Sequence, residues 1–532
     1  MKKALVSFLG IAMLVTGMLV SPAFLFAAGE EETMSSAELT EPGVFPVQPG
    51  ITLQAGWNSG RWGSAEENLW AQSWAEPTGV TLEFVEMENE EKITIVFSAD
   101  DYPDLMLGTA GLEKNLIARL LQEGVVADLR PYLFQGYTPN LDQIFTEKPE
   151  SLAYMLNPEG KLSNLARFQF QESHYLEQNY MINRKWLDAL GLDVPTTTDE
   201  LRDVLIAFRD NDANGNGDAG DELPFGYMAT DGYAQHLRSM YGIWGMPTKN
   251  GIAITDGTAY FAPITDAYRE MVTYFADLYS EGLIDPESFT QSRADFDAKV
   301  DDPAGNVYGF IIAVRGYQGT DGRAEFESIP PFRAPGHEPE IWVHPGRLAI
   351  KHVWFMTDVN PYPEHTMAWV DRFYTLENSV QSMFGIAPEG VKLIDGVWTP
   401  QEIPAERRQK ISTVGAIPAL FRAEDYGVRL AMDASSQLLY DAYYAHYIDY
   451  KAAEQWVRPE FTDSEQTEVN ELRTDINTLW QSNEARWITG AGDIDKEWDE
   501  YVEQMKAMRI DRYVELHQAA HTRFADEIGD RR

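Results

Sequence analysis

The stretch from Asp210 to Glu222 places the tightest constraint on how this chain of 532 residues can fold. It reads Asp-Asn-Asp-Ala-Asn-Gly-Asn-Gly-Asp-Ala-Gly-Asp-Glu, so oxygen-bearing side chains alternate with small residues. A hard cation such as Ca²⁺ takes about six to eight oxygen ligands from a chain that turns sharply at glycine. The alternative is a solvated polar turn. Residues 199–209 have helical apolar spacing and Leu223 begins an apparent strand, so the sequence favours a cation at a helix–strand joint.

Two registers fit the cation. One begins at Asp210 and turns at Gly215, and the other begins at Asp212 and turns at Gly217. In both, an acidic residue at the end of the stretch closes the site. The match to an EF-hand loop is partial, because no helix follows the loop. The candidate ligands are Asp212, Asn214, Asn216, the Asp218 carbonyl, and Asp221 or Glu222.

The first residues predict export. Two lysines precede an apolar run, and small residues follow at Ala27, Ala28 and Gly29, which is typical of a cleaved signal peptide over 1–29. A single membrane anchor is the alternative. Residues 30–48 are acidic and small, and they are interpreted as a disordered spacer. The exported protein is expected in the periplasm or outside the cell.

Length and composition bound the remaining choices. The chain has no cysteine, so its stability must come from its core, and about 500 mature residues predict two or more domains. There are 84 acidic and 42 basic residues, a net charge of −42, which argues against nucleic acid and anionic lipid as partners and favours a solubility adaptation. The 14 Trp and 25 Tyr exceed the needs of a core and suggest a groove that stacks on sugar rings.

Strands and helices alternate from Ile51 onward, which predicts an α/β fold with parallel sheets. In such sheets, ligands lie beyond the carboxyl ends of the strands. Besides Gly108 and Thr109, the residues that follow predicted strands and become candidate ligand contacts are Trp57, Asn58, Arg61, Trp62, Arg315 and Tyr317. Core packing is the competing interpretation for Trp57, and a surface ion pair is the competing one for Arg315.

Motifs for catalysis are absent from the sequence. It contains no Gly-x-Ser-x-Gly, no Walker loop and no His-Glu-x-x-His. Carboxylates are so frequent that a glycosidase pair cannot be recognised by counting. The sequence therefore gives little sign of catalysis.

Several phrases occur in one order along the chain. They are Asp101-Tyr-Pro-Asp-Leu, the segment from Asn183 to Thr197, the loop from Asp212 to Pro224, Leu278-Tyr-Ser-Glu-Gly-Leu-Ile-Asp-Pro-Glu, Arg486-Trp-Ile-Thr-Gly, and Trp498 to Arg523. Together they resemble the extracellular solute-binding proteins of carbohydrate ABC transporters, in the large branch with alginate-oligosaccharide binders and LipO-like lipoproteins.

The resemblance implies a two-lobed, type II periplasmic-binding fold, in which each lobe is a mostly parallel sheet flanked by helices and the C-terminal region is helical. Lobe 1 is expected over 49–175 and 330–392, and lobe 2 over 176–329 and 393–532, with crossings near 172–178, 327–333 and 390–397. Gln169 and Glu172 then lie at the hinge as further candidate ligand contacts.

The resemblance also implies the function. The protein would be a monomer that captures an oligosaccharide by hinge closure and delivers it to ABC permease subunits, with a structural Ca²⁺ in the Asp212 register. Gly220 is an extra residue relative to the family loop, and the lipid-bearing cysteine of the lipoproteins is missing. The rival hypothesis is a secreted, calcium-stabilised glycoside hydrolase or polysaccharide lyase.

Overall fold

The structure is a computed structural model. It describes residues 39–108, 114–176, 179–229, 237–301, 307–313, 325–344, 346 and 348–529. The predicted signal peptide lies outside these residues. The chain divides into the units 1–39 and 40–532, and the following concerns the second. The predicted disordered spacer is ordered at its end, because Val47 is buried and its N–H donates to the Thr78 carbonyl (2.8 Å).

One sheet of the structure has six strands in the order β14-β4-β11-β3-β1-β2. β11 runs antiparallel to both of its neighbours, while the pairs β1–β2, β1–β3 and β14–β4 are parallel. It follows that β1, β3, β4 and β14 all end at one edge of the sheet, where β11 begins. The strands are β1 (Ile51–Trp57), β2 (Val80–Glu86), β3 (Leu105–Leu107), β4 (Leu165–Gln169), β11 (Ile350–Met356) and β14 (Ala419–Phe421).

The second sheet has the order β10-β5-β9-β6. β5 is antiparallel to β10 and β9, and β6 is parallel to β9, so both sheets are mixed and this one departs from the predicted mostly parallel pattern. β6, β9 and β10 end at the edge where β5 begins. The strands are β5 (Asn179–Asn183), β6 (Leu223–Gly226), β9 (Tyr308–Ala313) and β10 (Phe326–Ile329), and two hairpins are formed by β7 (Ile252–Thr255) with β8 (Thr258–Phe261) and by β12 (Val391–Ile394) with β13 (Val397–Pro400).

The chain passes between the sheets at these edges. It leaves β4 at Gln169 and enters β5 at Asn179, then leaves β10 at Ile329 and enters β11 at Ile350. The first passage contains the expected crossing at 172–178, and the second overlaps the one at 327–333. The third expected crossing, near 390–397, does not fit the strand order, because β14 pairs with β4 in the first sheet and the chain leaves that sheet only after Phe421. The expected lobe boundaries otherwise stay a prediction.

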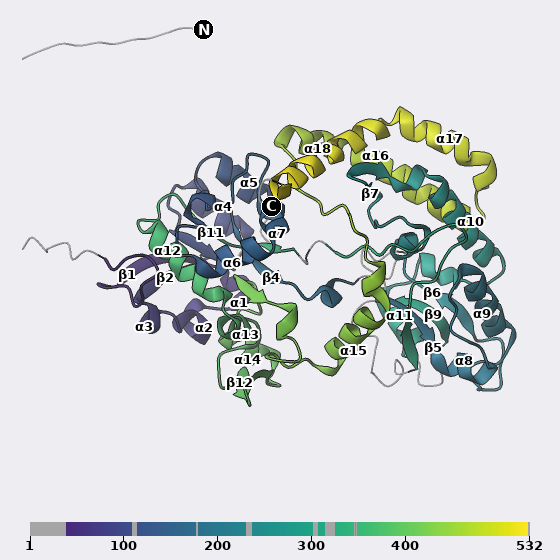
Figure 1. The fold of residues 1–532 in the computed structure, drawn as a ribbon, viewed down its shortest axis with the longest axis horizontal. Helices are drawn as coiled ribbons and strands as arrows, with labels where there is room; N and C mark the ends of the chain where they lie inside the picture. The colour runs from purple at the N-terminus through teal and green to yellow at the C-terminus, as the bar shows by residue number, and fades with distance from the viewer. Residues whose placement is uncertain are drawn as a thin grey trace, which may run out of the picture. The chain divides into compact units, whose positions relative to one another are not determined.

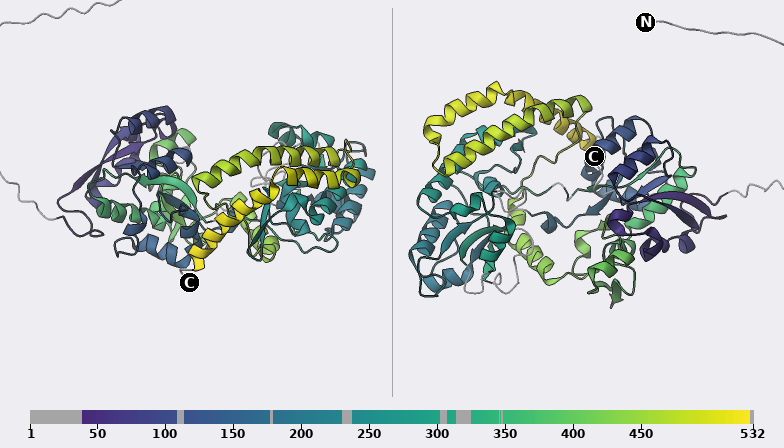
Figure 2. Two further views of the ribbon diagram at one scale, coloured as in Figure 1. Left: turned by 90° about the horizontal axis from the view of Figure 1, so that it is seen from above. Right: turned by 180° about the vertical axis from the view of Figure 1, so that it is seen from behind.

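Helices flank both sheets (Figure 1). The long C-terminal helices α16, α17 and α18 pack on one another, and α18 also contacts β8 and α7 (Figure 2). No helix within the described ranges has both the length and the hydrophobicity to span a membrane. The helices are α1 (Ser59–Trp62), α2 (Leu69–Gln72), α3 (Ala75–Thr78), α4 (Glu90–Ser98), α5 (Lys114–Gln122), α6 (Pro139–Glu147), α7 (Pro149–Met155), α8 (Arg184–Leu190), α9 (Thr198–Asp210), α10 (Asp266–Ser280), α11 (Arg293–Val300), α12 (Pro363–Asp371), α13 (Leu376–Phe384), α14 (Ala405–Ile411), α15 (Ala434–Ala442), α16 (Asp463–Ile488), α17 (Ile494–Ala507) and α18 (Ile510–Gly529).

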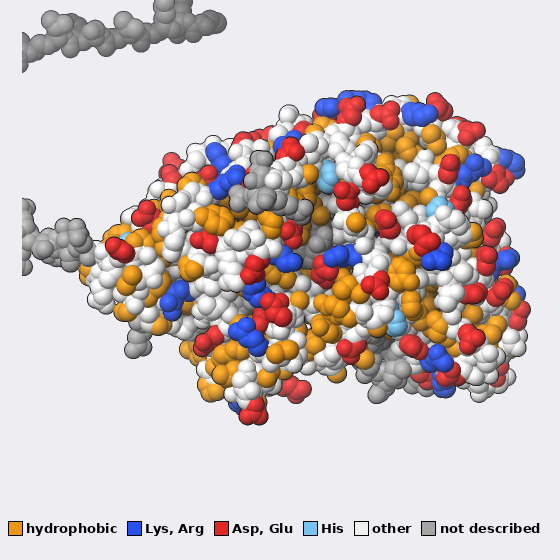
Figure 3. Space-filling view, viewed as in Figure 1, with side chains coloured by type: hydrophobic (Ala, Val, Ile, Leu, Met, Phe, Trp, Pro, Cys, Tyr) orange, Lys and Arg blue, Asp and Glu red, His pale blue; other side chains and the backbone are white. Residues whose placement is uncertain are grey.

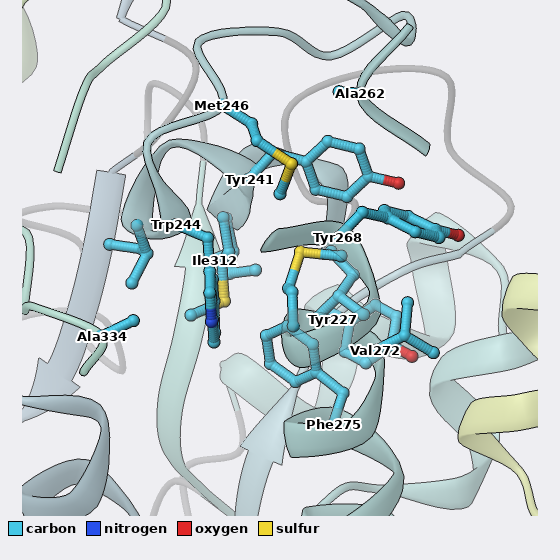
Figure 4. Close-up of a cluster of buried hydrophobic side chains, with 14 of the residues drawn as sticks. Tyr227, Tyr241, Trp244, Met246, Ala262, Tyr268, Val272, Phe275, Ile312 and Ala334 are labelled. Carbon is cyan, nitrogen blue, oxygen red and sulfur yellow. The ribbon is translucent and has the colours of Figure 1, made fainter. Parts of the chain in front are cut away.

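The largest core cluster joins the second sheet to the C-terminal helices. Figure 4 shows its aromatic part, where Tyr241, Trp244, Tyr268 and Phe275 lie close together. Buried rings of α16, α17 and α18 belong to the same cluster. The C-terminal helices are therefore part of the fold and not an appendage.

Helix α9 forms as the sequence predicts. Thr197 caps it, because its hydroxyl accepts the N–H of Glu200 (3.1 Å). Phe208 at its end is fully buried and packs edge-on against Trp186. Gly309 in β9 makes room for Phe208, since a Cβ there would lie 2.3 Å from the Phe208 ring. This close approach holds the end of α9, and the acidic loop after it, against the second sheet.

The Gly309→Ala substitution should therefore destabilise the protein. The added methyl group overlaps a buried ring, and overpacking of this kind costs about 1–3 kcal/mol. Chemical denaturation of the variant and the parent measures the change. Gly529→Ala is the control, because a Cβ there meets nothing within 4 Å, and it should cause no loss. Equal midpoints for Gly309→Ala and the parent would contradict the packing described here.

His517 is a buried titratable group of α18. Its ring packs on Trp456, Phe461 and Tyr513, and its Nδ1 bonds to the Tyr513 carbonyl (2.7 Å). Burial, with a further contribution from Arg473, lowers the pKa of His517 from 6.5 to about 4. The unfolded chain therefore binds more protons than the folded one between these values, and stability falls as the pH falls through this window.

Between pH 7 and pH 5, His517 should account for about 2 kcal/mol of lost stability. The His517→Gln variant keeps a donor for the Tyr513 carbonyl but does not titrate. Its free energy of unfolding should therefore fall less than that of the parent between these two pH values. Parallel pH dependences in the two proteins would mean that His517 is protonated equally in the folded and unfolded states.

Candidate functional site

The end of β1 does not present Trp57 to solvent. Its side chain is fully buried, its Nε1–H donates to the Gly63 carbonyl (2.8 Å), and its ring packs edge-on against Phe84. This burial fits the core interpretation of Trp57 given by the sequence. The polar sequence around Trp57 reflects the turn that follows it, whose backbone satisfies the indole, and not exposure of the ring.

Trp62 and Gly108 come together as the strand-end rule predicts. Trp62 lies in α1 after β1 and Gly108 follows β3, and a Cβ at Gly108 would lie 2.6 Å from Trp62 Nε1. Trp62 is 5% exposed, so this structure shows little of its ring. Asn58 lies between β1 and α1. The side chain of Arg61, together with Thr109, Arg315 and Tyr317, falls outside what the structure describes.

Gln169 and Glu172 stand where the chain leaves β4. Gln169 Nε2 donates to the Tyr426 hydroxyl (3.1 Å), and the Glu172 carboxylate accepts from Lys451 Nζ (2.9 Å) and from the Tyr443 hydroxyl (2.7 Å). Glu172 thus joins the first crossing to the segment that follows α15. The sequence offered no signal for Lys451 or Tyr443, because their partner is 271 or more residues away.

In the acidic loop, the carboxylates that begin the two registers have different partners. The Asp210 carboxylate accepts from Arg209 Nε (2.7 Å) and is turned onto that residue. Asp212 instead faces the loop, where its Oδ2 accepts the Gly217 N–H (2.9 Å). Gly215 and Gly217 both adopt positive φ, as a tight turn requires. The geometry therefore agrees with the register that begins at Asp212.

The other candidate ligands converge on the end of this loop. The Asn214 and Asn216 side-chain amides donate to the Asp221 carboxylate (3.2 and 2.6 Å), and Glu222 Oε1 accepts the Asn214 N–H (3.3 Å). The Asp218 side chain turns away and accepts the Gly220 N–H, consistent with a role for its carbonyl only. The loop thus gathers these residues without a second helix.

Two buried oxygens of this loop have no hydrogen-bond donor. They are Asp212 Oδ1 and Glu222 Oε2. Burial raises the pKa of Glu222, and the charge of Asp221 raises it further. No group of three or more His, Cys, Asp or Glu in metal-binding geometry occurs among the described residues, but amides and carbonyls supply part of a calcium shell. Two donor-free carboxylate oxygens in an oxygen-rich loop fit a hard cation.

A cavity of about 820 Å³ lies between residues attached to the first sheet and the C-terminal helices. Tyr154 of α7 and Lys351 of β11 line one side, and Trp480 of α16 and Tyr513 of α18 line the other. Lys351 Nζ lies over the Tyr154 ring and donates to Glu460 (3.1 Å). None of these residues was a candidate in the sequence, since none follows a strand.

Charges on the molecular surface are spread out. Figure 3 shows acidic and basic side chains mixed over one face, with no single large patch of either sign. Arg422, at the end of β14, is bonded to Glu147 and is not a free cation. This distribution agrees with an acidic surface that serves solubility.

Comparison with known proteins gives a consistent result. No protein-family model matches the chain. The chain is 27% identical over 537 residues to the fructooligosaccharide ABC transporter substrate-binding protein FusA of Streptococcus pneumoniae, covering 96% of this chain and 97% of FusA. The structure of FusA in complex with kestose is 25% identical, with a TM-score of 0.68 over 90% of this chain and 100% of that one.

Two further structures match. One is FusA described as an EF-hand mutant in complex with fructo-nystose, at 24% identity and a TM-score of 0.68 over 90% of this chain and all of that one. The other is an HMO binding ABC-transporter associated solute-binding protein of Bifidobacterium longum infantis, at 21% identity and a TM-score of 0.73 over 90% and 99%. At these identities the comparison shows that both proteins have the same fold as this chain. By its fold and its nearly full-length likeness to FusA, the chain belongs to the solute-binding proteins of carbohydrate ABC transporters, a family of binding proteins and not of enzymes.

Proposed function

We propose that the protein captures an oligosaccharide outside the cytoplasm, as a monomer, and delivers it to the permease subunits of an ABC importer. The observation that carries this proposal is the likeness to FusA over 96% of this chain and 97% of the relative. Such a match covers both sheets and both sides of any site between them.

The strand directions support a capture mechanism. The edge where β1, β3, β4 and β14 end is joined by two crossings to the edge where β6, β9 and β10 end. A ligand between these edges touches segments of both sheets only when they close on it, so ligand contacts favour the closed state. The residues proposed to contact the sugar are Asn58, Arg61, Trp62, Gln169, Glu172, Arg315 and Tyr317, while Trp57 supports them from within the core.

We further infer that the loop from Asp212 to Glu222 binds Ca²⁺ structurally. Asp212 Oδ1 and Glu222 Oε2 are buried without donors, and Asp221 and Glu222 repel each other when both are charged. A cation would satisfy the two oxygens and offset the repulsion. It would also hold the end of α9 to the start of β6, because the loop connects them.

Kestose and nystose are the first sugars to test for capture. If the protein is a binding component, one or more short oligosaccharides in a panel should raise its melting temperature in a dose-dependent way. Chromatography of the sugar after long incubation should show no cleavage. Turnover at catalytic protein concentrations would favour the secreted hydrolase or lyase instead, and the absence of any thermal shift over a broad panel would contradict capture.

Chelation should lower the melting temperature, and Ca²⁺ should restore it better than Mg²⁺, which gives up its water less readily. At a hundredfold excess of Ca²⁺ over the dissociation constant, binding adds about 2.7 kcal/mol to the free energy of unfolding. Asp212→Ala should abolish this response.

Asp210→Ala is the matched control for the calcium test. Asp210 belongs to the other register and is bonded to Arg209, so its removal should leave the calcium response intact. Loss of the response in Asp210→Ala alone would reverse the assignment of the register. Identical melting of the parent protein in chelator and in millimolar Ca²⁺ would mean that the loop is a polar turn.

A further inference from the structure

More basic than acidic residues line the cavity described above, which is the opposite of the chain as a whole. The whole protein has twice as many acidic as basic residues. The basic residues that line the cavity are Arg238, Lys249, Lys351, Arg458 and Arg473, and the acidic ones are Glu159, Glu460 and Asp463. A concave surface with an excess of one charge focuses the field and concentrates ligands of the opposite sign.

Four of these eight charged side chains are bonded to named protein groups. Lys351 donates to Glu460 (3.1 Å), and Gln122 donates to Asp463. Arg238 lies over the Trp480 ring and pairs with Glu484 behind it (3.3 Å). Two of the three acidic groups are thus bonded to protein, and the third, Glu159, is exposed.

Arg458 and Arg473 are different. Within the described part of the chain, neither forms an ion pair or a hydrogen bond through its guanidinium. Both act on the same place, because the charges of Arg473 and Arg458 lower the pKa of Tyr513 against the larger effect of its burial. Two uncompensated guanidinium groups therefore lie beside one wall of the cavity in a strongly acidic protein.

The backbone at Arg458 is also unusual. Its φ is +58°, a left-handed conformation that non-glycine residues rarely adopt, and it precedes Pro459, which normally holds the preceding residue extended. His352, which lines the same cavity, has a φ of +62°. Such conformations gather at ligand sites, where the surrounding fold holds them. The fold therefore holds Arg458 in this position against the local preference.

The neighbouring side chains suit a sugar. Asn477 and Gln481 follow Arg473 at intervals of four residues on α16 and line the cavity with it, so amide groups and a guanidinium share one helix face. Tyr154 and Phe461 are half-buried aromatic rings of the lining. Amides bond hydroxyl groups, rings stack on sugar faces, and a guanidinium fork matches a carboxylate.

We propose that this cavity binds the carboxylate of an acidic oligosaccharide, a chain containing uronic acid, through Arg458 and Arg473. The proposal rests on the proposed function, and it narrows the sugar to a class that the neutral ligands of the FusA complexes do not represent. The negative charge of the whole protein does not oppose it, because the field inside the cavity is set by the nearby arginines.

Calorimetric titration with matched sugars tests the proposal. The acidic probes are trimers of galacturonic, mannuronic and glucuronic acid, and the neutral probes are kestose and the methyl ester of the galacturonic trimer. At least one acidic trimer should bind ten times or more tighter than the neutral probes, and its affinity should fall with added salt.

Substitutions locate the site. Arg473→Gln and Arg458→Gln should each weaken binding of the acidic trimer at least tenfold and reduce its salt dependence, with melting temperatures near that of the parent. Arg486→Gln is the matched control on the same helix, because Arg486 pairs with Glu497 and does not line the cavity. It should leave binding unchanged.

The outcomes separate the two proposals. Tight binding of kestose with no binding of any acidic trimer would overturn this inference and leave oligosaccharide capture standing. Acidic binding that survives both arginine substitutions would also overturn it. Binding of inorganic sulfate with the same affinity as the acidic trimers would also overturn the inference, because the site would then recognise an anion and not a sugar. Failure of every sugar, neutral and acidic, would contradict capture itself.

Discussion

The antiparallel placement of β11 between β3 and β4 is the constraint on which the arrangement of the site depends. It lets the chain leave the first sheet after β4, build the second sheet, and re-enter the first sheet at the same end. It also makes the four strands around it end at one edge. Both passages between the sheets therefore join the same edge of the first sheet to the same edge of the second. A change in the angle between the sheets alters contacts there while the backbone ladders within each sheet stay intact.

A small polar network ties the passages together. Tyr447 receives the Tyr180 N–H (2.9 Å) at the start of β5 and donates to the Ile329 carbonyl (2.8 Å) at the end of β10. Four residues earlier, Tyr443 donates to Glu172, which also holds Lys451. Both passages are thus bonded to neighbouring tyrosines of one helical segment, the first at Glu172 and the second at Ile329.

Local signals in the sequence predicted what local chemistry determines. The helical spacing of residues 199–209 and the order from helix through acidic loop to strand were predicted from neighbouring residues and are present. Pairing over long distances was not accessible in this way. The three residues of β14 carry no sign that they pair with β4, and the burial of Trp57 depends on Gly63 and Phe84 closing around it. The hydrogen bond from Arg209, which turns the Asp210 carboxylate away from the loop, was not evident from the sequence.

The excess of aromatic residues, taken from the sequence as a sign of a sugar-stacking groove, has largely another use. Trp57, Trp186, Trp354, Trp369, Trp480 and Trp487 are all fully buried. In a chain without disulfides, large rings fill the space between long helices and two sheets. In the proposed function, sugar recognition rests on fewer, half-buried rings and on polar groups that the core does not need. Among the described residues that line the cavity, Arg458 and Arg473 are cations without a bonded partner, so their positions bear more directly on the proposed ligand than the number of rings does.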